Sequence, residues 1–285
     1  MKKNVFLIIW VIFSIMPLNS YSSKKIKLLE VGVCTNFSNG EFLKQNGYSF
    51  IEESVGRFLM PTKNEKEFNE MLQQAQNAAI PVKACNSFIP KELKSVGPDA
   101  VHTQILEFAE TTFRRAQKAG VEIIVFGSGG SRAIPEGFSR EKARAQFIEL
   151  CKKMASIAKK NNITIVLEPL NTNECNFINS ISEGSQIVKE VNHLNFRLLA
   201  DLYHMRMENE SSESIIQYGK LIKHVHIAEK KDRAVPGTYN EDFSLYFDAL
   251  KRTGYNGKIS IEARWQDFDT QIPMAMETIK KQCNN

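Results

Sequence analysis

Four acidic or imidazole side chains stand at the ends of predicted strands in the second half of the chain. The segment ITIVLE ends on Glu168, RLLAD on Asp201, HVH on His226 and KISIE on Glu262. Three carboxylates and one imidazole suit a divalent ion that accepts oxygen ligands, such as Mn²⁺, Mg²⁺, Co²⁺ or Zn²⁺. If neighbouring strands bring these tips together, the sequence predicts a site for one divalent metal ion. The alternative is four unrelated polar residues that happen to end strands.

Three further polar residues lie shortly after these strand tips, namely Glu174, His204 and Arg233. Each could hydrogen-bond a polyol or hold a metal ligand in place, and each could equally be a solvated loop residue.

Two other polar features have less specific interpretations. His224 stands two residues before His226, and we expect its side chain to face the surrounding helices. The segment GSGGS at 127–131 could offer backbone N–H groups to an anion, although a plain turn is the preferred interpretation.

The tips belong to a regular alternation of strands and helices. Apolar, β-branched runs alternate with segments whose apolar residues recur at helical spacing. We expect strands at residues 25–34, 48–52, 80–85, 121–126, 163–167, 196–201, 223–228 and 258–263. We expect helices from residue 64, at 102–119, across the segment that contains Phe147 and Met154, and near 181–192, 212–222, 243–252 and 273–282.

This alternation predicts an α/β protein that folds as a single (β/α)₈ TIM barrel. In such barrels, active sites form at the C-terminal ends of the strands, which is where the polar tips fall. A doubly wound open sheet is the alternative. It requires a glycine-rich phosphate turn after the first strand, and GVCTNFSNG matches that fingerprint poorly.

The first residues have the pattern of a secretory signal. Lys2 and Lys3 precede a mostly apolar run from Val5 to Pro17, and a Ser-x-Ser sequence follows at 20–22. We therefore expect residues 1–22 to be a signal peptide and residues 23–285 to form the barrel. The expected location is secreted or periplasmic, without stable membrane insertion after cleavage. A buried N-terminal strand or helix is the alternative.

Net charge and cysteine spacing argue against a nucleic-acid-binding protein and against a metal site made of cysteines. Removal of residues 1–22 takes away Lys2 and Lys3, which lowers the formal net charge from +5 to +3. The chain has no dense basic run, so nothing argues for a nucleic-acid partner. The five cysteines show no metal-type Cys-x-x-Cys spacing, and we expect mostly buried free thiols.

The segments EPLNTNE, DLYHM, HVHIAEKKDRAVPG and ISIEA resemble the motifs of the xylose isomerase-like TIM-barrel family. Within it they are most similar to ketose 3-epimerases of the D-tagatose 3-epimerase type. The resemblance covers most of the chain after the signal and is sharpest from Ile163 onward. It implies metal ligation by Glu168, Asp201, His226 and Glu262, acid–base catalysis by Glu168 and Glu262, and substrate contact by Glu174, His204 and Arg233.

The implied activity is that of a metal-dependent sugar isomerase or epimerase. Such an enzyme removes a proton next to a carbonyl and passes through an enediolate. Return of the proton to the opposite face of the same carbon gives epimerisation, and return to the neighbouring carbon gives aldose–ketose isomerisation. If a leaving group lies β to the carbanion, the same groups would act as a secreted 3-keto-glycoside lyase or hydratase.

Two other classes of protein are alternatives. One is an endonuclease IV-like nuclease, whose three-metal cluster needs more histidines at strand tips than this chain offers. The other is a non-catalytic sugar-binding barrel, which would not need two opposed carboxylates beside a metal. We expect a small sugar or keto-sugar as partner. The sequence leaves open which sugar it is, whether it is phosphorylated, and whether the chain forms a homo-oligomer.

Overall fold

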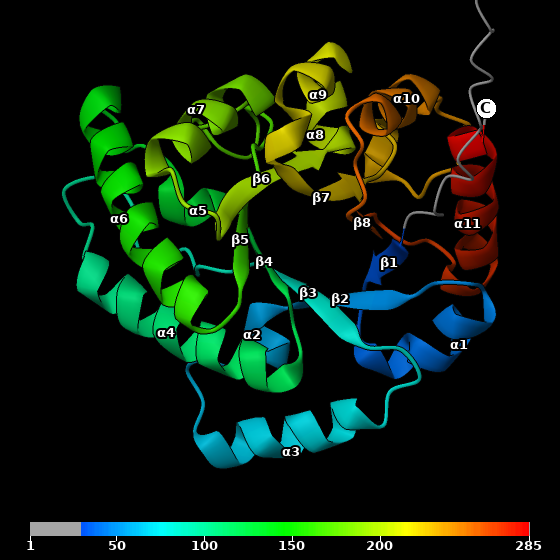
Figure 1. Ribbon diagram of the computed structural model, residues 1–285, viewed down its shortest axis with the longest axis horizontal. Coiled ribbons are helices and arrows are strands. Elements are labelled where there is room, and N and C mark those ends of the chain that lie inside the picture. Colours follow the sequence, from blue (N-terminus) through cyan, green and yellow to red (C-terminus); the bar gives the residue numbers. More distant parts are fainter. Residues whose placement is uncertain (1–29, 285) are drawn as a thin grey trace, which may run out of the picture.

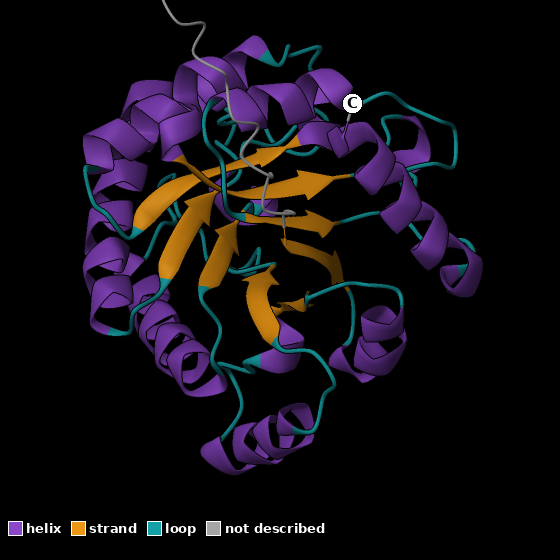
Figure 2. Cartoon of the chain, turned by 45° about the vertical axis from the view of Figure 1, so that its right-hand side comes forward, coloured by secondary structure: helices purple, strands orange, loops and turns teal. Residues whose placement is uncertain are grey.

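Eight parallel strands close into one barrel in the computed structural model, which describes residues 30–284 (Figures 1 and 2). The strands pair in chain order, and β8 completes the ring against β1. Their bounds are Glu30–Cys34 (β1), Phe50–Ser54 (β2), Val82–Asn86 (β3), Ile123–Phe126 (β4), Thr164–Leu167 (β5), Phe196–Asp201 (β6), Ile222–Ile227 (β7) and Lys258–Ile261 (β8). The predicted (β/α)₈ barrel is confirmed. The signal peptide predicted for residues 1–22 lies outside the described residues.

Helices surround the ring of strands, with α3 at its outer edge (Figure 1). The α-helices are Gly40–Gln45 (α1), Val55–Phe58 (α2), Glu65–Gln76 (α3), His102–Ala119 (α4), Gly129–Arg132 (α5), Arg140–Lys160 (α6), Ile181–Val191 (α7), Leu202–Met207 (α8), Glu213–Tyr218 (α9), Ser244–Arg252 (α10) and Phe268–Asn284 (α11). Short 3₁₀ turns are Phe37–Asn39 (η1), Gly219–Leu221 (η2) and Lys231–Arg233 (η3).

The strands are buried because apolar side chains cover both of their faces. On β4, Ile124 and Phe126 pack in the large cluster between strands and helices. Ile123 and Val125 point to the opposite face, where they join a smaller cluster with Val166 of β5. Side chains alternate between the two faces of a strand, so a continuous apolar run is what a strand with two covered faces requires.

Several helices differ from the sequence-based expectation, and the unpredicted short helices α1, α2 and α5 are among them. The short helix α8 was not predicted; it begins immediately after Asp201, whose Oδ1 accepts hydrogen bonds from the N–H groups of Tyr203 (2.7 Å) and His204 (3.2 Å). The last helix begins at Phe268 rather than near Pro273, because Asp267 Oδ1 accepts from the N–H of Asp269 at 3.2 Å. In both cases a side-chain cap starts a helix earlier than apolar periodicity indicates.

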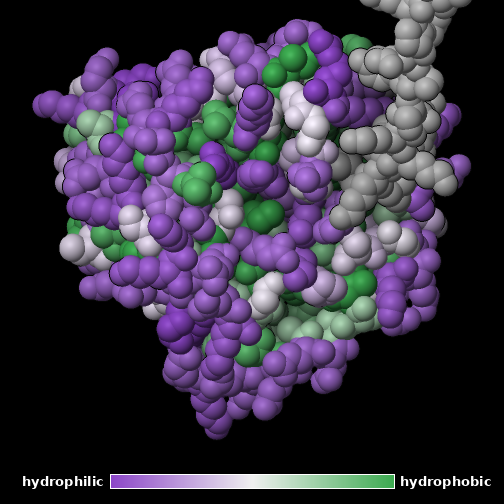
Figure 3. All heavy atoms as spheres, in the orientation of Figure 1, coloured by the Kyte–Doolittle hydropathy of each residue, from purple (hydrophilic) through white to green (hydrophobic). Residues whose placement is uncertain are grey.

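The outer surface is mostly hydrophilic on the face in Figure 3, where hydrophobic residues form smaller patches. No helix among residues 30–284 is both long enough and apolar enough to span a bilayer. The cysteines are free thiols, as expected, and Cys85, Cys151 and Cys175 are buried.

Candidate metal and active site

The four predicted tip residues come together at the C-terminal end of the barrel. Asp201 is the last residue of β6 and pairs in register with His226 of β7, while Glu168 and Glu262 directly follow β5 and β8. One ligand atom from each residue lies within 4.8 Å of the others. The barrel therefore converts four separate strand ends into one cluster of three carboxylates and an imidazole.

His226 Nδ1 lies at the centre of this cluster. It is 3.1 Å from Glu168 Oε1, 3.2 Å from Glu262 Oε2 and 3.9 Å from Asp201 Oδ2. Glu168, Asp201 and His226 are buried, whereas the Glu262 side chain is 26% exposed. Glu262 thus forms the open side of the cluster, from which a small molecule could approach.

The donor atoms fit a divalent cation. Asp201 Oδ1 caps α8, but Asp201 Oδ2 is buried and has no hydrogen-bond partner among the described residues. Such an unpaired buried oxygen is costly unless a cation or donor satisfies it. Carboxylate oxygens with one imidazole nitrogen are suitable ligands for the divalent ions proposed from the sequence.

The pKa shifts of Glu168 and His226 also indicate that the cluster would stabilise a cation. Burial raises the pKa of Glu168, and the nearby carboxylates of Glu262 and Asp201 raise it further. Burial disfavours the charged form of His226, but Glu52, Glu262 and Glu168 together hold its pKa well above the usual range. The carboxylates therefore favour positive charge at their centre.

Arg233 lies against the open side of the cluster. Its Nη2 donates to Glu262 Oε2 at 2.5 Å, its Nε donates to the Glu262 carbonyl at 3.2 Å, and its Nη1 donates to Glu174 Oε1 at 3.4 Å. The guanidinium also lies 4.7 Å from the ring centroid of Tyr203. These contacts fix the orientation of the planar guanidinium group beside Glu262.

The loop that carries Arg233 is held by a buried carboxylate. Glu229 accepts hydrogen bonds from the N–H groups of Gly237 (2.8 Å) and Tyr239 (2.6 Å). Gly237 has a φ of 101°, a left-handed conformation that a glycine adopts without strain. Glu229 thus organises the loop, and its hydrogen bonds within residues 30–284 go to backbone N–H groups of this loop rather than to the cluster.

His204 and Glu174 border the same space as Arg233. His204 Nδ1 accepts a hydrogen bond from the N–H of Asn171 at 3.1 Å. Its Nε2 is buried without a hydrogen-bond partner in the described part of the chain, 3.6 Å from Asp201 Oδ2 and 4.0 Å from Glu174 Oε2. The structure therefore brings all three predicted sugar-contacting side chains to the edge of the cluster.

Three residues of the site were missed by sequence reasoning. Asn86, at the end of β3, donates from Nδ2 to Glu262 Oε1 at 3.1 Å. Gly127 follows β4, and a Cβ atom there would lie 2.2 Å from Glu168 Oε2. Glu52 is fully buried on β2, 3.0 Å from His226 Nε2. Asn86 and Glu52 stand at or next to the end of a predicted strand, so a polar strand tip could have indicated them, whereas Gly127 has no side chain and gave no such signal.

Two sequence-based interpretations need correction or refinement. His224 does not face the helices: side chains two residues apart on a strand share a face, and both His224 and His226 reach Glu52. The GSGGS segment is more than a plain turn, because its residues from Gly129 begin the short helix α5.

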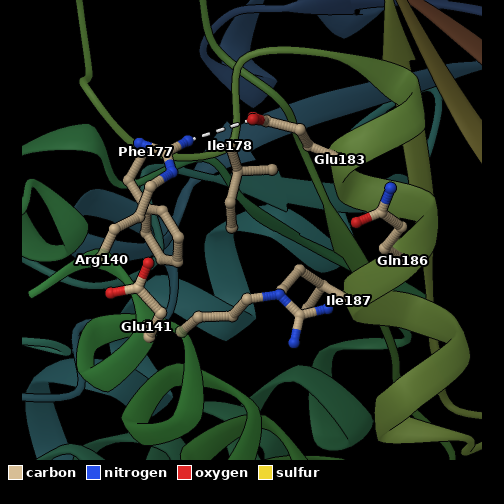
Figure 4. Close-up of a pocket in the computed structure, with 8 residues that line it drawn as sticks. Arg140, Glu141, Phe177, Ile178, Glu183, Gln186 and Ile187 are labelled. Atoms are coloured by element: carbon tan, nitrogen blue, oxygen red, sulfur yellow. Dashed lines mark hydrogen bonds and ion pairs between the residues drawn. The ribbon is translucent and has the colours of Figure 1, made fainter.

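A pocket lies away from this cluster, on the outer surface between α6 and α7 (Figure 4). Arg140 spans part of it and pairs with Glu183 at 3.1 Å. The other lining residues are Glu141, Arg144, Phe177, Ile178, Gln186 and Ile187. None of the cluster residues lines this pocket, so the two features are separate.

Comparison with known sequences relates the chain to sugar-converting enzymes. The model of a family described as xylose isomerase-like TIM barrel matches residues 41–282. L-Ribulose 3-epimerase of Methylomonas sp. (strain DH-1) is 34% identical over 167 residues, which cover 52% of this chain and 58% of that relative. Hydroxypyruvate isomerase of Escherichia coli (strain K12) is 28% identical over 135 residues, covering 46% and 52%. The chain thus spans little more than half the length of these relatives.

Comparison with solved structures shows a shared fold. The structure of D-psicose 3-epimerase with D-tagatose from Clostridium cellulolyticum H10 aligns with a TM-score of 0.75 at 20% identity. The alignment covers 89% of this chain and 98% of that one.

Proposed function

The chain belongs to the xylose isomerase-like TIM-barrel family, and from this premise we propose that it is a metal-dependent sugar epimerase or isomerase. One observation carries the proposal. Glu168 and Glu262, from strands on either side of His226, approach the same imidazole nitrogen at 3.1 and 3.2 Å within a cluster suited to a divalent ion. A site with a cation position and two flanking carboxylates can move a proton next to a carbonyl.

The cluster residues have distinct roles in this proposal. Glu168, Asp201, His226 and Glu262 would hold the ion. When bound, a divalent ion polarises a substrate carbonyl and stabilises the negative charge that develops on its oxygen. Glu168 and Glu262 exchange the proton with the carbon next to that carbonyl. Burial and the neighbouring carboxylates raise the pKa of Glu168, whereas a bound cation would favour the ionised carboxylate that ligation requires.

The polar edge of the site binds the sugar. Arg233 and the buried Nε2 of His204 can donate to hydroxyl or carbonyl oxygens, and Glu174 can accept from hydroxyl groups. Asn86 and Arg233 each donate to one oxygen of Glu262, so this carboxylate is oriented before substrate enters. Preorganisation of the reacting carboxylate reduces the cost of reaching the transition state.

Epimerisation of a ketose at carbon 3 is the reaction that we favour. The similarity to L-ribulose 3-epimerase extends over more residues, and at higher identity, than that to hydroxypyruvate isomerase. Both reactions begin with removal of a proton next to a carbonyl. They differ in the carbon to which the proton returns.

Incubation in D₂O with a panel of ketoses, aldoses and 3-keto-glycosides tests this function. Full-length protein loaded with Mn²⁺, Mg²⁺, Co²⁺ or Zn²⁺ should place deuterium at carbon 3 of a ketose and produce its epimer, as followed by NMR. An aldose product would indicate isomerisation, and an unsaturated product would indicate elimination. A protein that binds a sugar but exchanges no proton with any compound would refute the enzymatic proposal.

Replacement of Arg233 by Ala should lower kcat/KM by about tenfold or more. One hydrogen bond to a charged group is worth about 1.5–3 kcal/mol, and about 1.4 kcal/mol corresponds to a factor of ten. Arg233→Lys should restore only part of this, since lysine keeps the charge but loses the planar fork. Steady-state kinetics on the ketose found in the exchange experiment measure the effect, with metal content checked by elemental analysis.

Lys231→Ala is the matched control, because Lys231 lies in the same loop but its Nζ packs over the Tyr239 ring at 4.0 Å. It should leave kcat/KM unchanged. Equal kcat/KM in the wild type and in Arg233→Ala would show that Arg233 does not contribute to the reaction.

A further inference from the structure

Glu52 connects the candidate metal cluster to the interior of the barrel. The side chain is fully buried on β2, and three donors surround its two oxygens. Oε1 lies 3.0 Å from His226 Nε2, and Oε2 lies 2.7 Å from His224 Nε2 and 2.7 Å from Ser260 Oγ. A carboxylate with three such partners has a single well-defined orientation.

The Glu52 carboxylate determines which nitrogen of His226 carries a proton. Both oxygens of Glu52 lie at hydrogen-bond distance from imidazole nitrogens or a hydroxyl group, which is the environment that an ionised carboxylate requires. An ionised carboxylate only accepts hydrogen bonds, so His226 must donate from Nε2. A neutral imidazole then has its lone pair on Nδ1, which is the atom that faces Glu168 and Glu262.

The partners of Glu52 come from strands that lie two and three positions away around the closed ring. His224 lies on β7 and Ser260 on β8, whereas Glu52 lies on β2. Ser260 also pairs in register with His226. Closure of the barrel therefore places a rigid acceptor directly behind the imidazole of His226.

We propose that Glu52 is a positioning residue that holds His226 as the Nε2–H tautomer and so presents Nδ1 as a metal ligand. The inference rests on the metal site of the proposed function. Carboxylates that orient a ligating histidine typically change metal affinity by about 10- to 100-fold when they are replaced.

The neighbouring residue Glu53 provides a matched control. It is also fully buried, but it accepts from the N–H of Phe37 (2.8 Å) and from Nε of Arg57 (2.7 Å) on the other face of β2. Glu53→Gln removes the same charge from the same strand at the same depth. It should affect folding as much as Glu52→Gln, without touching His226.

The decisive measurement is Mn²⁺ affinity of the full-length wild type, Glu52→Gln and Glu53→Gln, by EPR titration. We expect about 10- to 100-fold weaker binding for Glu52→Gln and no measurable change for Glu53→Gln. Circular dichroism identifies any variant that does not fold. In that case Ser260→Ala, which removes one donor to Glu52, should still weaken Mn²⁺ binding by about threefold, the effect of one modest hydrogen bond.

Long-range ¹H–¹⁵N spectra of Zn²⁺-loaded, histidine-labelled protein test the tautomer directly. The wild type should show His226 protonated at Nε2, and this signal should be lost or shifted in Glu52→Gln. Equal Mn²⁺ affinity of Glu52→Gln and Glu53→Gln would overturn the role of Glu52 while leaving the proposed function intact. Failure of the wild type to bind any divalent ion would overturn both.

Discussion

Replacement of Glu262 by Gln is expected to lower kcat by about 10²-fold or more while the protein still binds its divalent ion. The amide oxygen of Gln can remain a weak ligand, but an amide cannot take up and release a proton at neutral pH. In the structure Glu262 Oε1 accepts from Asn86 and Oε2 accepts from Arg233. The replacement keeps the size of the side chain and one of these two hydrogen bonds, and it removes the acid–base function.

The measurement combines kcat on the identified ketose with elemental analysis of the purified variant. Glu277→Gln, which alters an exposed carboxylate on α11, controls for the loss of one negative charge. It should retain wild-type kcat. A folded, metal-loaded Glu262→Gln protein with full activity would show that Glu262 is not the acid–base group.

Replacement of Gly127 by Ala should lower turnover by about 10²-fold with little loss of stability, since a displacement of about 1 Å in an active site can have this effect. A Cβ atom at this position would lie 2.2 Å from Glu168 Oε2, and the next neighbour, Glu168 Cδ, is at 3.3 Å. The end of the Glu168 side chain can move away, so the barrel tolerates the methyl group. The carboxylate, however, leaves the position that faces His226 Nδ1.

The affinity of Gly127→Ala for a divalent ion should also fall, by about 10- to 100-fold. This is the usual effect of replacing a residue that positions a metal ligand without binding the ion itself. Gly56→Ala is the control, because a Cβ at Gly56 has no neighbouring atom within 4 Å. Thermal unfolding, Mn²⁺ titration and kcat of both variants separate stability from site geometry. Wild-type affinity and turnover in Gly127→Ala would mean that Glu168 does not need its observed position.

The four strand-tip residues could be predicted because their signals are local. Each lies at or near the end of a mostly apolar run that favours a strand, and ITIVL before Glu168 is an example. One general property of parallel barrels, that all strands present their C-terminal ends at the same face, then brings the tips together. Neither step requires knowledge of how the side chains pack.

The residues that orient these tips depend on contacts across the ring. The hydrogen bond from Asn86 to Glu262 joins residues 176 positions apart, and that between His226 and Glu52 spans 174. Such pairs form only when β8 closes against β1 and the register of every strand is set. No spacing within the chain indicates which polar side chains will meet across the barrel.

The sequence by itself determined the alternation of strands and helices, the barrel that follows from it, and the ligand chemistry at four strand ends. Only the tertiary structure decided that His226 directs Nδ1 to the carboxylates and Nε2 to Glu52, and that Glu262 is the carboxylate beside Arg233. It also placed the carboxylate of Glu168 in the space that a Cβ atom at Gly127 would occupy. The physical reason is that strand formation depends on local side-chain pattern, whereas the orientation of a buried polar side chain depends on donors and acceptors that distant strands supply.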